Sequence, residues 1–277
     1  MPDAETGLVV LVGDPVEHSL SPQIHNAAFQ AQGLNLTYLA CRVSPARLAA
    51  AIDGLGALGG VGANVTIPHK QAVLELATSA SPSARAIGAA NTLVRTSDGW
   101  RADNTDPAGF LAPLDSYAES LRGELAILIG AGGAARAVAW ACTEHLGARV
   151  IVAARRVGQA RKLAETLGTE AMTVADAQRF ARDAALVINA TPVGMAPHAS
   201  LTPWTFPTGL RPSQIAYDLV YRPAQTRFLQ EAEAAGATCI GGLPMLIGQA
   251  AASYRQWTGR EMPLDVVRDI VSRQPDA

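Results

Sequence analysis

The chain has 277 residues, of which 49% are hydrophobic and 17% charged, a balance that excludes a disordered chain and leaves room for two domains of moderate size. Its 22 basic and 24 acidic residues give a formal charge of −2, so neither nucleic acid nor an anionic membrane surface is predicted as a partner. Two charge-free stretches, residues 184–210 and 234–254, contain several prolines or glycines, so neither is predicted to span a membrane. The acidic N-terminus is unlike a secretory signal, and three scattered cysteines indicate a reducing compartment, which together predict a cytoplasmic protein.

The first hundred residues alternate between short apolar runs and helical patterns. They predict strands at residues 8–13, 36–43 and 61–66, helices at 21–32 and 45–58, and a hairpin of strands 90–95 and 100–102. Ser21 precedes a proline and is expected to be the N-cap of the first helix.

A second α/β unit begins near Asp106. We predict strands at 125–129, 149–153, 185–189, 214–219 and 238–240, helices at 134–146, 157–167 and 224–235, and two further helices after residue 243. This alternation indicates a doubly wound parallel sheet with helices on both faces. We place a boundary near residue 103 and expect a substrate cleft between two α/β units.

A glycine-rich turn joins the strand at 125–129 to the helix that follows. The pattern is G-x-G-x-x-A, made of Gly130, Ala131, Gly132, Gly133, Ala134 and Ala135. Glycine permits the tight turn and the close approach of backbone to a pyrophosphate, and a strand before and a helix after are the context that gives the pattern meaning. The turn therefore predicts a dinucleotide site.

The end of the next strand indicates which dinucleotide is bound. NAD-binding proteins usually carry an acidic residue there, whereas this strand runs into Arg155 and Arg156, and the next acidic residue is Glu165. Arginine suits the 2′-phosphate of NADP through charge-assisted hydrogen bonds. We therefore predict NADP, with solvation of a helix start as the alternative role, above all for Arg156.

Several polar residues stand in segments whose other residues are typical of a hydrophobic core. Ser19 and Ser21 could hold a carboxylate, although on spacing alone capping by Ser21 is the better explanation. Lys70 is one of only two lysines among the 22 basic residues, as expected where a proton must be exchanged and arginine cannot do so. Asp106 precedes a proline, so helix capping is the alternative to catalysis. No histidine has metal-ligand spacing, and no metal site is predicted.

Taken together, these motifs resemble the shikimate dehydrogenase family over nearly the whole chain. The resemblance rests on the segments 13–22, 64–70, 104–106, 189–195 and 218–221, on Asn91 and the Gly130 turn, and on Met245-Leu246 with Gln249-Ala250. It implies a substrate domain of residues 1–103 and 243–277, in which the C-terminal helices return to the N-terminal α/β part, and a Rossmann-type NADP domain of residues 104–242.

The implied reaction is the reversible, NADPH-dependent reduction of 3-dehydroshikimate to shikimate, a step towards chorismate and the aromatic amino acids. Lys70 and Asp106 would be the catalytic pair: an ammonium can stabilise the developing alkoxide and supply its proton, and a neighbouring carboxylate keeps that ammonium charged. The remaining substrate contacts implied are Ser19 and Ser21 for the carboxylate, and Asn64, Thr66, Asn91, Tyr221 and Gln249 for the ring. Besides the glycine turn and Arg155, the implied cofactor contacts are Thr191, Met195, Gly242 and Met245.

Three alternatives remain open from the sequence. A quinate or dual-specific dehydrogenase using NAD has the same fold, and an acidic residue after the second strand would favour it, but none is present. An enzyme for an amino-substituted shikimate analogue and a non-catalytic NADPH- or shikimate-binding module are the others. Family members often have Asn-Arg-Thr where this chain has Ala154-Arg155-Arg156, which bears on the strictness of NADP use. The oligomeric state, including a homodimer, is also open.

Overall fold

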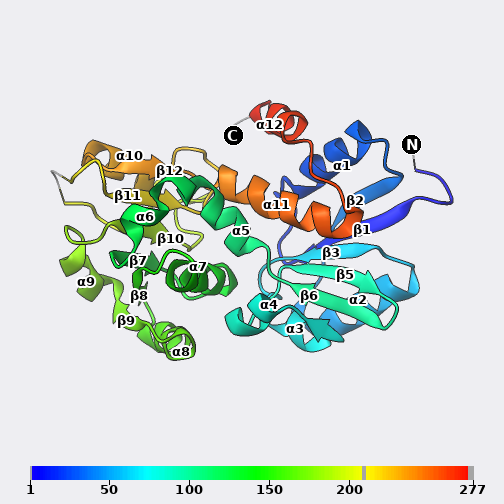
Figure 1. Ribbon diagram of the computed structural model, residues 1–277, viewed down its shortest axis with the longest axis horizontal. Helices are drawn as coiled ribbons and strands as arrows, with labels where there is room; N and C mark the ends of the chain where they lie inside the picture. Colours follow the sequence, from blue (N-terminus) through cyan, green and yellow to red (C-terminus); the bar gives the residue numbers. More distant parts are fainter. Residues whose placement is uncertain (1, 208–209, 274–277) are drawn as a thin grey trace. The chain divides into compact units, whose positions relative to one another are not determined.

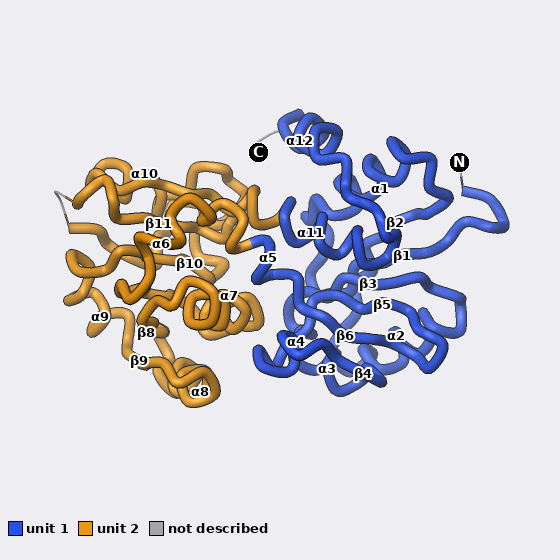
Figure 2. Tube along the Cα trace, viewed as in Figure 1, with its two compact units in different colours: residues 1–109, 247–275 blue, residues 110–246, 276–277 orange. Residues whose placement is uncertain are grey.

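The computed structural model describes residues 2–207 and 210–273, which form two compact units (Figure 2). Unit 1 holds the described residues within 1–109 and 247–275, and unit 2 holds residues within 110–246. The divisions expected near residues 103 and 243 lie a few residues earlier than those observed, so Asp106 belongs to unit 1. The long helix α11 (Leu243–Thr258) contains the second division.

Unit 1 is built on a six-stranded mixed sheet in the order β2-β1-β3-β5-β6-β4 (Figure 1). β1 (Gly7–Gly13) pairs in parallel with β2 (Leu36–Arg42) and β3 (Gly62–Val65). β5 (Thr92–Thr96) runs antiparallel to β3 and to β6 (Gly99–Asp103), and β4 (Ser79–Ala80) lies parallel to β6. The predicted hairpin is therefore confirmed.

Helices cover the middle of this sheet because consecutive residues of β1 and β3 are buried, so both faces there need a cover. Val10 and Val12 of β1 pack with Leu48 and Ile52 on α2 (Leu48–Ala57), which follows the 3₁₀ turn η1 (Pro45–Arg47). The indole N–H of Trp257 donates to the Leu93 carbonyl at 3.0 Å, which places α11 against the sheet. The other helices of unit 1 are α1 (Ser21–Ala31), α3 (Ala72–Leu76), α4 (Pro82–Ile87) and α12 (Leu264–Ser272), with α5 (Asp106–Leu111) at the division.

Unit 2 is built on a six-stranded, wholly parallel sheet in the order β12-β11-β10-β7-β8-β9. Its strands are β7 (Leu125–Ile129), β8 (Arg149–Ala154), β9 (Glu170–Thr173), β10 (Leu186–Asn189), β11 (Ile215–Asp218) and β12 (Thr238–Ile240). Its helical segments are η2 (Ala112–Tyr117), α6 (Ala118–Leu121), α7 (Gly133–Glu144), α8 (Val157–Leu167), α9 (Val174–Ala177), η3 (Gln178–Phe180) and α10 (Arg227–Ala234). This is the predicted Rossmann-type arrangement.

The strand order of unit 2 fixes where a ligand is expected. Alternate residues of β7 face opposite cores: Leu128 packs with Val138 of α7, and Ile127 packs with Phe228 of α10. Chain order reverses between β7 and β10, and parallel sheets of this kind bind ligands at the carboxyl ends of the strands beside such a reversal. Gly130 follows β7 and Thr191 follows β10, so both lie at that point.

Candidate functional site

Lys70 and Asp106 form a buried ion pair in unit 1. Lys70 Nζ lies 2.5 Å from Asp106 Oδ2, and the two side chains are 12% and 5% exposed. Asp106 is the first residue of α5, and its backbone N–H donates to the side-chain oxygen of Asn104 at 3.1 Å. The Asn104 side chain therefore accepts a backbone N–H at the start of α5, and the Asp106 carboxylate pairs with Lys70 and does not cap the helix.

Asn91 holds the second oxygen of that carboxylate. Its Nδ2 donates to Asp106 Oδ1 at 2.7 Å, while its Oδ1 accepts the backbone N–H of Thr105 at 2.8 Å. Because a backbone N–H can only donate, the amide oxygen must face Thr105, and the amide N–H₂ must face Asp106. Both carboxylate oxygens are thus engaged, and the pair has one defined geometry.

A buried network of hydroxyl groups continues from Asn91 to α11. The hydroxyls of Thr92 and Thr105 lie 2.8 and 3.0 Å from the hydroxyl of Ser253, which itself donates to the Gln249 carbonyl at 3.0 Å. Ser253 is fully buried, so such a group requires hydrogen-bond partners. The network therefore ties the Asn91 region to α11.

Asn64 and Tyr38 extend the same network into the sheet. Asn64 Nδ2 donates to Ser253 Oγ at 3.0 Å and to the Asn91 carbonyl at 3.1 Å, and its Oδ1 accepts the Tyr38 hydroxyl at 2.8 Å. Of the predicted substrate residues, the structure thus brings together Asn64, Lys70, Asn91 and Asp106. Sequence reasoning gave no role to Tyr38, Thr92, Thr105 and Ser253. Tyr38, Thr92 and Ser253 stand beside apolar residues, which was the available signal, and Thr105 lies inside the motif 104–106.

Ser19 and Ser21 lie at the start of α1, but the predicted cap is wrong. Leu20 occupies the N-cap position with no side-chain cap, and Ser21 is the first helical residue. The Ser21 N–H donates to Ser19 Oγ at 3.2 Å, so the two serines share one turn, with Ser21 buried and Ser19 partly exposed. Thr66 after β3 and Gln249 on α11 are partly exposed.

The glycine turn of unit 2 fits a dinucleotide phosphate. Gly130 has φ +125°, and a Cβ there would lie 2.9 Å from the Ala190 carbonyl oxygen, so a side chain is excluded. Gly132 is exposed, with no heavy atom of the surroundings within 4 Å of its added Cβ, so its backbone is open to a ligand. α7 begins at Gly133, and Ala135 is fully buried in the helix packing. Ala131, Gly133 and Ala134 are partly exposed along the same turn.

The other predicted cofactor residues of unit 2 lie in loops after strands or in α11. Arg155 and Arg156 follow β8 and are exposed, and their side chains make no hydrogen bond or ion pair with the residues that the structure describes. Thr191 and Met195 lie in the loop after β10, Met195 with 43% of its surface exposed. Tyr221, which is predicted to contact the substrate ring, follows β11. Gly242 packs against the Leu219 carbonyl, where an added Cβ would lie 2.4 Å from the oxygen, and Met245 is buried.

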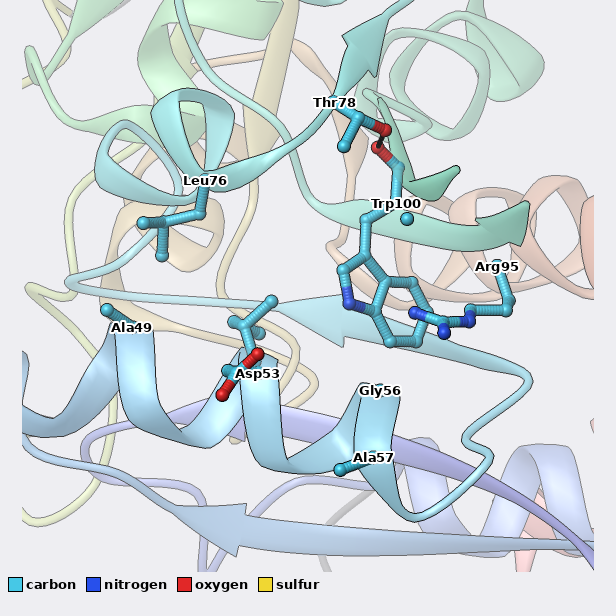
Figure 3. A pocket seen from close by; sticks show the side chains of 10 residues that line it. Ala49, Asp53, Gly56, Ala57, Leu76, Thr78, Arg95 and Trp100 are labelled. Carbon is cyan, nitrogen blue, oxygen red and sulfur yellow. Dashed lines mark hydrogen bonds between the residues drawn. The ribbon is translucent and has the colours of Figure 1, made fainter. Parts of the chain in front are cut away.

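A separate pocket of about 460 Å³ lies in unit 1 between α2 and the β5–β6 hairpin (Figure 3). Asp53, Leu76 and Trp100 line it, and the Arg95 guanidinium lies 5.2 Å from the Trp100 ring centre. Its lining includes none of the predicted site residues. Among the described residues there is also no group of three His, Cys, Asp or Glu side chains suited to a metal ion, and no helix long and apolar enough to cross a bilayer.

Three family models match the chain in order. They are the shikimate dehydrogenase substrate binding domain at residues 11–93, shikimate / quinate 5-dehydrogenase at 114–201, and the shikimate 5′-dehydrogenase C-terminal domain at 242–271. Together they span the ion pair's lysine, the glycine turn and α11.

Relatives with such names cover nearly the full length. Shikimate dehydrogenase (NADP(+)) of Salinibacter ruber is 50% identical, over 97% of this chain and 98% of that protein. The crystal structure of shikimate 5-dehydrogenase from Thermus thermophilus in complex with NADP(H) and shikimate is 37% identical, with a TM-score of 0.86 and coverage of 97% and 99%. Quinate dehydrogenase from Corynebacterium glutamicum in complex with NAD is 31% identical, with a TM-score of 0.87 and coverage of 97% and 99%. The glycine turn, the lysine–aspartate pair and this full-length similarity lead to one conclusion: the chain belongs to the shikimate dehydrogenase family.

Proposed function

We propose that this chain is an NADP-dependent shikimate dehydrogenase that reversibly reduces 3-dehydroshikimate to shikimate. The observation that carries the proposal is the Lys70–Asp106 ion pair, buried and fixed by Asn91. A ketone reduction needs a proton donor at the carbonyl oxygen, and a positioned ammonium is such a donor. The similarity to relatives named for NADP and shikimate supports this choice of substrate and cofactor.

The proposed chemistry divides between the bound cofactor and the chain. NADPH, when bound, supplies the hydride. Lys70 stabilises the negative charge that develops on the substrate oxygen and then protonates it. Asp106 keeps the ammonium in place and accepts a hydrogen bond from a substrate hydroxyl, and in the reverse direction Lys70 takes the proton back.

The remaining roles follow the implied contacts. Ser19 and Ser21 bind the substrate carboxylate, and the ring contacts are those of Asn64, Thr66, Asn91, Tyr221 and Gln249. We assign substrate binding to unit 1 with residues of α11, and the dinucleotide to unit 2. The pyrophosphate lies on the Gly130–Ala135 turn, Arg155 with Arg156 binds the 2′-phosphate, and Thr191, Met195, Gly242 and Met245 complete the cofactor contacts. Two exposed arginines after β8, whose side chains have no partner among the described residues, suit a phosphomonoester.

A quinate or dual-specific dehydrogenase using NAD is the second candidate, because a quinate dehydrogenase with NAD has a similar fold. The decisive assay offers purified protein shikimate or quinate, each with NADP or NAD, and follows formation of the reduced nicotinamide by absorbance. We expect fast reduction with shikimate and NADP alone. Comparable rates with quinate or NAD would favour the second candidate, and no rate in any pairing from folded protein would refute both.

Arg155→Ala is expected to raise KM for NADP by roughly 10- to 100-fold, the worth of a charge-assisted bidentate hydrogen bond, and to leave KM for NAD nearly unchanged. The measurement is steady-state kinetics with each cofactor at saturating shikimate. Arg161→Ala, at an exposed position of α8, is the matched control. Equal effects of Arg155→Ala on both cofactors would contradict the 2′-phosphate role.

The compartment and assembly belong to the proposal as well. Cys41, Cys142 and Cys239 are free thiols, which suits a reducing compartment and supports a cytoplasmic enzyme. The partners proposed are the small-molecule substrate and NADP, and a homodimer remains a prediction that sedimentation analysis can test.

A further inference from the structure

Asp218, the last residue of β11, is a fully buried carboxylate to which the chemistry above gives no role. Its Oδ1 accepts the Asn189 side-chain amide at 2.9 Å and the Val220 backbone N–H at 3.0 Å, and its Oδ2 accepts the Thr226 hydroxyl at 2.5 Å. No cationic side chain of the described residues pairs with it. Burial raises the pKa of Asp218 to about 6, against the opposite influence of these three hydrogen bonds.

The side chains of Thr226 and Asn189, which donate hydrogen bonds to Asp218, can each do so in only one orientation. Thr226 is the N-cap of α10, where its oxygen accepts the Leu229 N–H at 3.3 Å, and its single hydroxyl proton therefore goes to the carboxylate. Asn189 Oδ1 accepts the N–H and the hydroxyl of Thr191 at 3.0 and 2.7 Å, so its Nδ2 must face Asp218. An ionised carboxylate accepts only, so Asp218 is compatible with this one orientation and holds the Asn189 amide in place through Nδ2.

The Asn189 amide in turn shapes the loop after β10. Its Nδ2 also donates to the Val193 carbonyl at 3.1 Å, and the Val193 N–H donates to Thr191 Oγ1 at 3.2 Å. Hydrogen bonds to the Asn189 side chain thus hold the backbone of residues 190–193 in one conformation. A reversed amide would place donors against the Thr191 N–H and hydroxyl, and this loop conformation would be lost.

That loop contacts the glycine turn. The Ala190 N–H donates to the Ile129 carbonyl at 2.8 Å, and a Cβ added to Gly130 would lie 2.9 Å from the Ala190 oxygen and 3.3 Å from Thr191 Cγ2. A loop packed this closely cannot shift without moving the turn or opening a gap beside it. The hydrogen bonds therefore run from Asp218, through Asn189, to the wall of the predicted pyrophosphate site.

We propose that Asp218 is a positioning residue for cofactor binding, whose carboxylate fixes Asn189 and, through it, the 190–193 loop against the Gly130 turn. The inference rests on the proposed function in one respect, that the turn binds the NADP pyrophosphate. It adds a residue without cofactor contact to those that determine NADP affinity.

A double-mutant cycle tests the proposal. We expect Asp218→Ala and Asn189→Ala each to raise the dissociation constant of NADP, measured by calorimetry without substrate, by about tenfold or more. The double variant should bind as Asn189→Ala does, because the aspartate acts only through the asparagine. Additive effects, or an Asp218→Ala dissociation constant within about twofold of wild type, would overturn the proposal. If Asp218→Ala does not fold, Asp218→Leu, of similar size and without a hydrogen-bond acceptor, takes its place in the cycle.

Two further measurements separate positioning from stability and from the proposed function. Thr226→Val removes the donor to the other carboxylate oxygen together with the α10 cap, so it should lower stability and leave NADP affinity within about twofold. Hydrogen exchange at the Thr191 and Val193 amides, measured without cofactor, should accelerate in Asp218→Ala; unchanged protection would refute the positioning role. Wild-type protein that fails to bind NADP would refute the proposed function, while the exchange result would still stand.

Discussion

Lys70→Ala is expected to lower kcat for shikimate oxidation by about 10²- to 10⁴-fold, the usual worth of a positioned general acid–base group. The side chain is 12% exposed and its Nζ lies 2.5 Å from Asp106 Oδ2, so truncation removes the ammonium held at that carboxylate. The NADP dissociation constant should change little, because Lys70 belongs to unit 1 and the glycine turn to unit 2. Steady-state kinetics and calorimetric NADP titration of the same preparation test both expectations.

Lys70→Arg distinguishes charge from proton transfer. Arginine keeps the positive charge opposite Asp106, but its guanidinium does not give up a proton in this pH range, so turnover should fall nearly as far as in Lys70→Ala. The matched control is Lys162→Arg, at an exposed position of α8, which should be as active as wild type. Near-normal turnover in either Lys70 variant would remove this residue from the mechanism.

The longer helices and strands were predicted because each has its own pattern of apolar residues and turn residues in the sequence. β7 is five consecutive buried apolar residues, and the glycines that follow it can only be a turn, so this strand, the turn and α7 were all identified. The short elements α3, β4, α4, β9 and α9 were not predicted, because two to six residues are too few to show a helical or strand periodicity of hydrophobic residues. Ser21 was misplaced as a cap because serine before proline fits both the N-cap and the first helical turn.

The site was predictable as a set of residues and not as a network. Lys70 and Asp106 were predicted from the family pattern and, for Lys70, from the rarity of lysine, and the structure places the two side chains in one ion pair. The bond between Thr92 and Ser253 joins residues 161 positions apart, and no local pattern indicates such a pair. The same holds for the orientation of Asn91, which depends on a backbone N–H brought to it by folding.

His25→Phe is expected to remove a large part of the protein's acid sensitivity. His25 is fully buried, neither ring nitrogen has a hydrogen-bond partner among the described residues, and burial lowers its pKa from 6.5 to about 3. Between pH 6.5 and about pH 3 the unfolded chain binds a proton at His25 and the folded chain does not. The contribution of the neutral His25 to stability is therefore complete above pH 6.5 and is lost as pH falls towards 3. At about 1.4 kcal/mol per pH unit, the loss at pH 4 is about 3 kcal/mol.

The difference in unfolding free energy between wild type and His25→Phe, measured by urea titration at several pH values, isolates this contribution because all other groups are shared. Asp218, whose pKa is raised from 3.8 to about 6, acts with the opposite sign between those values in both proteins and cancels in the difference. Phenylalanine keeps the stacking on Tyr38, whose ring centre lies 4.5 Å away, and His198→Gln at an exposed loop position is the control. We expect the difference to grow steadily below pH 6.5 in favour of His25→Phe.

A difference that stays constant from about pH 7 to about pH 4 would mean that the folded protein protonates His25 without cost, which its burial argues against. The result also bears on the site, because the Tyr38 ring that stacks on His25 carries the hydroxyl bound to Asn64. Charging the imidazole would place an unpaired cation beneath that tyrosine. Activity and stability of the wild type should therefore fall together in acid, and His25→Phe should preserve both to lower pH.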